Sequence, residues 1–174
     1  EEQPPWYVLH TRPRVEKALA QRLLARSISF FLPLERRQWR KNGRAFTSHI
    51  PLFPGYVFLR AMEEERAEAL ETNLIANLLH VPDQGKLAED LRGIFLLMRS
   101  GKPLTPERRL RAGTPVVIRS GSLAGVEGVV VRDGRNAKVV IAVRFLQQGV
   151  SVEIDNQMLE PLENCHQLAN GLRN

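Results

Sequence analysis

The sequence predicts an α+β domain, with helices against a mainly antiparallel sheet, followed by a small five-stranded β-barrel. Across residues 1–103, some segments repeat their apolar residues with the helical period and others with the strand period. After residue 112 the helical period disappears, and short β-branched runs alternate with glycine-containing turns. This change of pattern divides the chain into two parts.

Three helices and four strands are expected in the first part, in addition to a hairpin. Val15, Leu19 and Leu23 recur every four residues and form one apolar stripe, which predicts an amphipathic helix over 13–26. The same reasoning predicts helices over 63–72 and 88–99. The expected strands are 6–9, 28–34, 56–59 and 74–81.

A hairpin is predicted around Asn42-Gly43, a dipeptide typical of two-residue turns because both positions tolerate a positive φ. A turn at this point pairs Trp39 with Phe46 and Lys41 with Arg44. The aromatic pair stabilises the hairpin, whereas like charges directly opposite each other destabilise it.

The predicted hairpin is a candidate nucleic-acid-binding element. A phosphate backbone would relieve the repulsion between its cations, and Trp39 or Phe46 would stack on an exposed base. The alternative is a solvated charged hairpin whose aromatic residues cap the core. Arg12, Arg14 and Lys17, placed on the first helix, are expected to extend the surface. The candidate cations of the hairpin are Arg36, Arg37, Arg40, Lys41 and Arg44.

Two prolines interrupt a polar, basic stretch over 101–109, which indicates a linker. We therefore assign residues 1–103 to an N-terminal domain, 104–112 to the linker, 113–163 to the barrel and 164–174 to a polar tail. The expected barrel strands are 116–118, 126–131, 138–145, 150–154 and 158–162.

Composition favours a binding protein. The 174 residues are 43% hydrophobic and 25% charged, as in ordinary globular proteins. A net charge of +6 and a pI near 10.1 favour a polyanionic partner, although solubility alone would also explain them. With a single cysteine, Cys165, and no apolar run of membrane-spanning length, we expect a cytoplasmic protein without membrane contact.

The sequence carries no pattern of a catalytic or metal site. Its four histidines lie far apart, and no glycine-rich loop ends in Gly-Lys-Ser or Gly-Lys-Thr. The glycines at 121, 125 and 128 precede a valine-rich strand, so no helix N-terminus is available there for a phosphate. We expect neither an enzyme nor a cofactor.

Three motifs together resemble the NusG family of transcription elongation factors, over about residues 6–162. Residues 6–9, Trp-Tyr-Val-Leu, followed by a basic helix resemble the family's opening. Residues 51–58, Pro-Leu-Phe-Pro-Gly-Tyr-Val-Phe, resemble its central signature. Residues 113–118 and 121–130 resemble the KOW motif, which forms a small SH3-like barrel.

The resemblance implies a monomer whose N-terminal domain binds the clamp helices of the largest RNA polymerase subunit and suppresses pausing or termination. The implied nucleic-acid partner is non-template DNA or nascent RNA, and Arg12 stands near the position that contacts this DNA strand in paralogs. The KOW barrel would recruit Rho or a ribosomal protein. A housekeeping factor and a specialised, RfaH-like paralog both remain open. The alternative is a ribosome-associated or RNA-binding KOW protein acting in translation.

The central signature also suggests a docking surface. Tyr56 and Phe58 are two residues apart on a strand and share one face, while Val57 and Leu59 share the other. We expect the aromatic face to bind the polymerase; the alternative is that all four side chains are buried. The polymerase-binding candidates within the motif are Phe53, Pro54, Tyr56 and Phe58. Further candidates are His10, at the end of the first strand, and Leu91 and Phe95, on the predicted helix 88–99.

Overall fold

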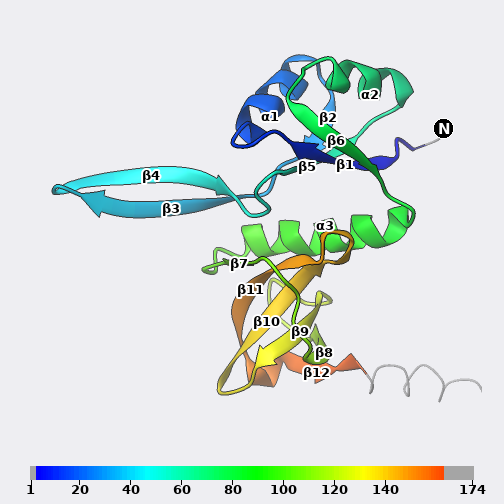
Figure 1. Ribbon diagram of the computed structural model, residues 1–174. Helices are drawn as coiled ribbons and strands as arrows, with labels where there is room; N and C mark the ends of the chain where they lie inside the picture. The colour runs from blue at the N-terminus through cyan, green and yellow to red at the C-terminus, as the bar shows by residue number, and fades with distance from the viewer. Residues whose placement is uncertain (1–2, 163–174) are drawn as a thin grey trace, which may run out of the picture. The chain divides into compact units, whose positions relative to one another are not determined.

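The computed structural model describes residues 3–162 of the chain. The internal contacts divide it into two compact units, Glu1–Ala88 and Glu89–Asn174. This division falls within helix α3 (Gln84–Arg99), upstream of the boundary at residue 103 that the linker pattern suggested. Figure 1 shows the elements of both units. The predicted polar tail, 164–174, lies outside the described residues.

The first unit is built on a four-stranded antiparallel sheet in the order β2-β5-β1-β6. Its strands are β1 (Trp6–Thr11), β2 (Ser29–Phe31), β5 (Tyr56–Arg60) and β6 (Ile75–His80). Helices α1 (Glu16–Ala25) and α2 (Glu63–Leu70) lie next to this sheet (Figure 1). Leu19 and Leu23 of α1 are buried in one core with Leu9, Val57 and Leu59 of the sheet, which confirms the predicted apolar stripe for these two residues. Val15, its third predicted member, precedes the helix and is only partly buried.

The first helix begins later than predicted. Arg14 has a φ of 63°, in the left-handed region, which a right-handed helix excludes. Pro13 and Arg14 therefore lie in a turn before α1, and not in its first turn as we expected. Helix α3 begins earlier than predicted, at Gln84 instead of residue 88.

The predicted hairpin is present with the predicted register. Strands β3 (Leu34–Lys41) and β4 (Arg44–Pro51) form a separate two-stranded sheet that extends away from the four-stranded one (Figure 1). Trp39 pairs with Phe46, and Lys41 pairs with Arg44. Asn42 and Gly43 have φ values of 50° and 74°, as a hairpin turn with two left-handed residues requires.

The second unit contains the five predicted barrel strands and one more, in the order β12-β8-β9-β10-β11-β7. Short 3₁₀ turns follow β10 and β11. The predicted strands are β8 (Thr114–Ile118), β9 (Glu127–Arg132), β10 (Asn136–Val143), β11 (Gln148–Asp155) and β12 (Leu159–Pro161). At Gly128 an added Cβ would lie 2.6 Å from Cγ1 of Val139, so β9 and β10 approach too closely for another residue.

The sixth strand comes from the segment that we predicted to be a linker. Residues Thr105–Glu107 form β7 and pair with the edge of β11. Pro106 is tolerated because an edge strand has one side without a partner for an N–H. The Glu107 carboxylate accepts a 2.8 Å hydrogen bond from the Ser151 hydroxyl and lies 2.6 Å from Nζ of Lys138. These contacts attach part of the segment 104–112 to the barrel.

Within residues 3–162, no helix combines the length and the apolar character that a bilayer span requires.

Candidate functional site

The Pro-Gly turn before β5 is held by the start of the first helix. Glu16, the first residue of α1, is only 8% exposed, and its Oε1 accepts a 2.7 Å hydrogen bond from the Gly55 N–H. The Gly55 carbonyl accepts a 2.8 Å bond from the Thr11 N–H. Gly55 has a φ of 87°, which other residues rarely adopt. Both backbone polar groups of Gly55 are therefore satisfied, and the turn has a defined shape.

His10 and Tyr56 form a stacked pair beside this turn. They are direct partners across β1 and β5, their ring centroids are 5.2 Å apart, and their planes differ by 27°. His10 is exposed and Tyr56 is half-buried. Pro54, which is exposed, precedes Gly55 in the turn. Three of the predicted docking residues, His10, Pro54 and Tyr56, thus lie near one another at the surface.

Phe53 and Phe58 do not present their rings to solvent, so the expectation of an exposed aromatic face is wrong for both. They are 1% and 0% exposed and pack edge to face, with centroids 6.0 Å apart. Phe31 of the neighbouring strand lies 6.3 Å from Phe58. The reason is that Phe53 packs on the Phe58 ring, while Phe31 of β2 and Val8 of β1 pair with Phe58 on its two sides.

The last two docking candidates, Leu91 and Phe95, lie in the part of α3 that belongs to the second unit. Leu91 is buried, at 3% exposure. Phe95 is 46% exposed, and the Arg99 guanidinium lies 5.9 Å from its ring centroid. Of these two residues, Phe95 alone offers an apolar side chain to solvent.

The hairpin aromatic residues contact each other and are exposed. The Trp39 and Phe46 centroids are 5.8 Å apart, and the ring planes differ by 16°. The two residues remain 47% and 41% exposed. The alternative in which these rings cap the core is therefore wrong.

The five candidate cations lie on the same hairpin as this aromatic pair and are all exposed. Arg37 forms an ion pair with Glu35, at 3.3 Å. Within the described part of the chain, the other four hairpin cations make no ion pair. The hairpin therefore carries positive charge that its own carboxylates do not compensate. These four are Arg36, Arg40, Lys41 and Arg44.

The remaining predicted cations lie near the Pro-Gly turn. Arg12 and Arg14 belong to the turn between β1 and α1, and only Lys17 lies on the helix, in contrast to our prediction. All three are exposed. Arg12 and Arg14 lie between Thr11 and Glu16, which are both hydrogen-bonded to Gly55, and Lys17 directly follows Glu16. These cations therefore flank the docking candidates.

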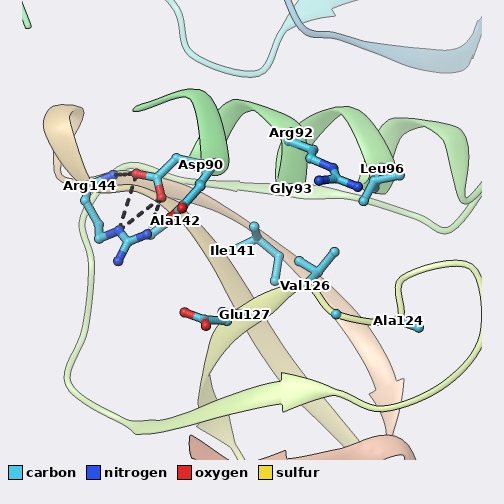
Figure 2. A pocket seen from close by; sticks show the side chains of 12 residues that line it. Asp90, Arg92, Gly93, Leu96, Ala124, Val126, Glu127, Ile141, Ala142 and Arg144 are labelled. Atoms are coloured by element: carbon cyan, nitrogen blue, oxygen red, sulfur yellow. Dashed lines mark hydrogen bonds and ion pairs between the residues drawn. The ribbon is translucent and has the colours of Figure 1, made fainter. Parts of the chain in front are cut away.

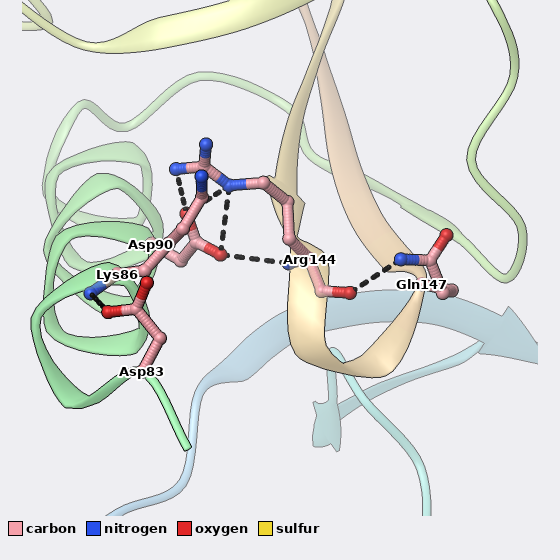
Figure 3. Close-up of polar contacts among 5 residues, drawn as sticks. All are labelled: Asp83, Lys86, Asp90, Arg144 and Gln147. Atoms are coloured by element: carbon pink, nitrogen blue, oxygen red, sulfur yellow. Dashed lines mark hydrogen bonds and ion pairs between the residues drawn. The ribbon is translucent and has the colours of Figure 1, made fainter. Parts of the chain in front are cut away.

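A second feature lies wholly within the second unit, where a groove of about 440 Å³ separates the 89–96 segment of α3 from barrel residues (Figure 2). Asp90, which is buried, closes one end. Its carboxylate accepts hydrogen bonds from the Arg144 N–H at 2.8 Å and from the guanidinium at 2.6 and 3.0 Å (Figure 3). This bonding raises the pKa of the Arg144 guanidinium above its ordinary value, so the side chain stays charged.

Glu16, Asp90 and Arg144 were not identified from the sequence as functional or structural residues. Their partners are 39 and 54 residues away in the chain, so no local spacing connects them. An acidic residue near a helix start is ordinary, because the helix dipole favours it. No sequence signal of the kind we used would have found these contacts.

Together, these features define a two-part protein, in which an α+β unit with a protruding basic hairpin is followed by a small barrel. A family model described as "NusG: Transcription termination factor nusG" matches residues 4–89. Residues 4–89 therefore belong to the NusG family, a family of transcription factors that act on elongation and its regulation.

One solved structure supports the fold. The structure titled "Domain interaction in Thermotoga maritima NusG" is similar, with a TM-score of 0.54 and 19% identity over 92% of this chain and 98% of that chain. The MjSpt4:Spt5 complex gives a TM-score of 0.31 at 13% identity, over 90% of this chain and 96% of that chain, a likeness without bearing on this protein. No curated protein sequence matches the chain.

Proposed function

We propose that this protein binds RNA polymerase at the clamp helices of the largest subunit, suppresses pausing or termination, and recruits a further partner through its barrel. Membership of the NusG family supports this proposal. The observation that carries it is the surface formed by His10, Pro54 and Tyr56, which we call the docking surface.

The docking surface suits a helical partner. Tyr56 combines an apolar ring with a polar tip, and aromatic residues of this kind are frequent hot spots of protein interfaces. The bonds of Gly55 to Glu16 and Thr11 hold the turn before binding, so little conformational entropy is lost on association. Phe53 and Phe58 do not contact the partner themselves. Their buried rings pack against each other and stabilise the strand and the turn that carry the docking surface. Phe95 is a further candidate on α3.

The basic cluster between β1 and α1 supports the same role. Arg12, Arg14 and Lys17 are exposed and flank the docking surface. Charge at the rim of an interface mainly accelerates association and directs orientation. We assign these three residues to contacts with the non-template DNA strand.

The hairpin supports a nucleic-acid contact of its own. Its four uncompensated cations would release counterions from phosphates on binding, which makes the interaction dependent on salt. The barrel, a compact unit with its own core, is assigned to the second partner, a ribosomal protein or Rho.

Retention of core RNA polymerase on the immobilised chain tests the docking surface. Tyr56→Ala combined with His10→Ala is expected to weaken binding at least about tenfold, as for interface hot spots. Leu24→Ala is the matched control, because Leu24 is 70% exposed and lies on α1, outside the docking surface. Pausing and readthrough by the purified polymerase, with and without the protein, then measure the activity.

Two results would contradict the proposal. One is undiminished polymerase binding by the double variant. The other is retention of ribosomal subunits without polymerase, which would favour the alternative role in translation.

A further inference from the structure

We infer that the hairpin β3–β4 has two chemically distinct faces, and that one of them binds an unpaired base of single-stranded nucleic acid. This inference rests on the proposed nucleic-acid contact of the hairpin and adds the form of the ligand and the side chains that select it.

The strand register separates the two faces. Side chains of directly paired residues lie on the same side of a hairpin, and successive pairs alternate between sides. One side, which we call the ring face, carries the pairs Arg37–Ser48, Trp39–Phe46 and Lys41–Arg44. The other, the polar face, carries Arg36–His49, Gln38–Thr47 and Arg40–Ala45.

On the ring face, the aromatic pair lies between two basic positions. Successive pairs on one face are two residues apart, or about 7 Å. The Lys41–Arg44 pair therefore lies about 7 Å from the rings on one side, and Arg37 lies about 7 Å from them on the other. Long cationic side chains span this distance, so a base on the rings would have its phosphates within reach of cations.

The exposure of the rings indicates a ligand. A cross-strand aromatic pair stabilises a hairpin by itself, but this role does not require rings that are 47% and 41% exposed. Trp39 and Phe46 are nearly parallel, and their stack leaves ring surface free for a further aromatic group. Because cations flank the pair, a nucleobase with its phosphates fits this face better than an apolar protein surface.

The same geometry selects single strands. In a duplex both faces of an internal base are covered by its neighbours, so stacking on Trp39 or Phe46 would first require unstacking. An unpaired base has a free face and meets the rings without this cost. The three pairs of the polar face contain no Trp, Tyr or Phe, and its Arg36 and Arg40 would contact phosphates of either form.

Tryptophan fluorescence tests the stacking directly. The chain has two tryptophans, so Trp6→Phe leaves Trp39 as the single tryptophan, which is excited selectively. This variant is titrated with a deoxyribonucleotide strand, a ribonucleotide strand of the same sequence, and the corresponding duplex. We expect either single strand to quench the emission of Trp39 and to bind several-fold tighter than the duplex.

Substitutions then locate the effect. Trp39→Ala with Phe46→Ala is expected to weaken single-strand binding at least about tenfold while duplex binding changes little. Gln38→Ala with Thr47→Ala removes the neighbouring pair on the polar face and should leave single-strand binding unchanged. Trp39→Phe with Phe46→Tyr keeps two stacked rings, so it should retain the preference even if the alanine variants lose the hairpin.

The inference is overturned if single strands bind without quenching Trp39, or if the ring substitutions weaken single-strand and duplex binding equally. Loss of the single-strand preference in the Trp39→Phe, Phe46→Tyr variant would also overturn the inference. Polymerase retention, measured on the same variants, reports on the docking surface. A failure of the ring face is therefore distinguishable from a failure of the proposed function.

Discussion

Glu16 and Gly55 lie 39 residues apart in the chain and are joined by a 2.7 Å hydrogen bond from the Gly55 N–H to the Glu16 carboxylate. This bond links the start of α1 to the turn that leads into β5. Because His10 and Tyr56 stack next to this turn, a contact with no direct part in binding sets the position of the docking surface.

The first prediction concerns this link. Glu16→Ala leaves the part-buried Gly55 N–H without its acceptor, and the loss of an acceptor for a buried donor typically costs about 1–3 kcal/mol of unfolding free energy. Glu16→Gln keeps an acceptor oxygen and should recover most of this loss. Urea unfolding measures the stability, and polymerase retention should follow the same order. Equal behaviour of the two variants would show that the hydrogen bond does not position the turn.

The second prediction separates core from surface on β5. Phe58→Ala should destabilise the first unit by about 3–5 kcal/mol, because it removes a fully buried ring. Tyr56→Ala should cost about 1 kcal/mol, since its side chain is only half-buried. Thermal unfolding of the two variants gives this comparison. A larger loss from Tyr56→Ala than from Phe58→Ala would contradict the assignment of Tyr56 to the surface.

The third prediction concerns Asp90 and Arg144 in the second unit. Asp90→Ala removes the acceptor of the Arg144 backbone N–H and guanidinium and should cost about 1–3 kcal/mol. Asp90→Asn, which keeps one acceptor oxygen, should cost less. Denaturant unfolding measures both. The matched control is Glu153→Ala, because Glu153 forms an ion pair with Arg132 in which both side chains are 62% exposed.

The fourth prediction is a pH dependence. The pKa of Glu107 lies below its ordinary value, mainly because the carboxylate accepts a hydrogen bond from Lys138, with a further bond from Ser151. In the unfolded chain the carboxyl group binds its proton at higher pH, so the stabilisation is complete above the ordinary pKa and is lost as the pH falls through the lowered one. Between about pH 6 and pH 3, the wild type should lose more stability than Glu107→Gln. Parallel stability curves for the two proteins would refute this assignment.

The fifth prediction concerns the salt dependence of nucleic-acid binding by the polar face of the hairpin. Replacement of Arg36 and Arg40 by Gln should lower the slope of log affinity against log salt by about 0.7 per lost contact with a single strand. Binding measured between about 50 and 200 mM salt gives the slope. An unchanged slope would remove both residues from the phosphate contacts.

Local sequence patterns predicted the elements that depend on neighbouring residues. The Asn42-Gly43 turn sets the register of its own hairpin, so the pairing of Trp39 with Phe46 followed from the sequence. The left-handed Arg14, which delays the start of α1, did not follow from the sequence, because arginine has no preference for a positive φ that would mark the turn.

The sequence by itself determined the α+β class, the five barrel strands and the basic hairpin, since hydrophobic period and turn residues act over a few positions. The tertiary structure alone decided that Phe58 is buried while Tyr56 reaches the surface, and that Glu16 holds Gly55. Burial depends on which strands become neighbours. In the order β2-β5-β1-β6 those neighbours are distant in the chain, so no local pattern contains the information.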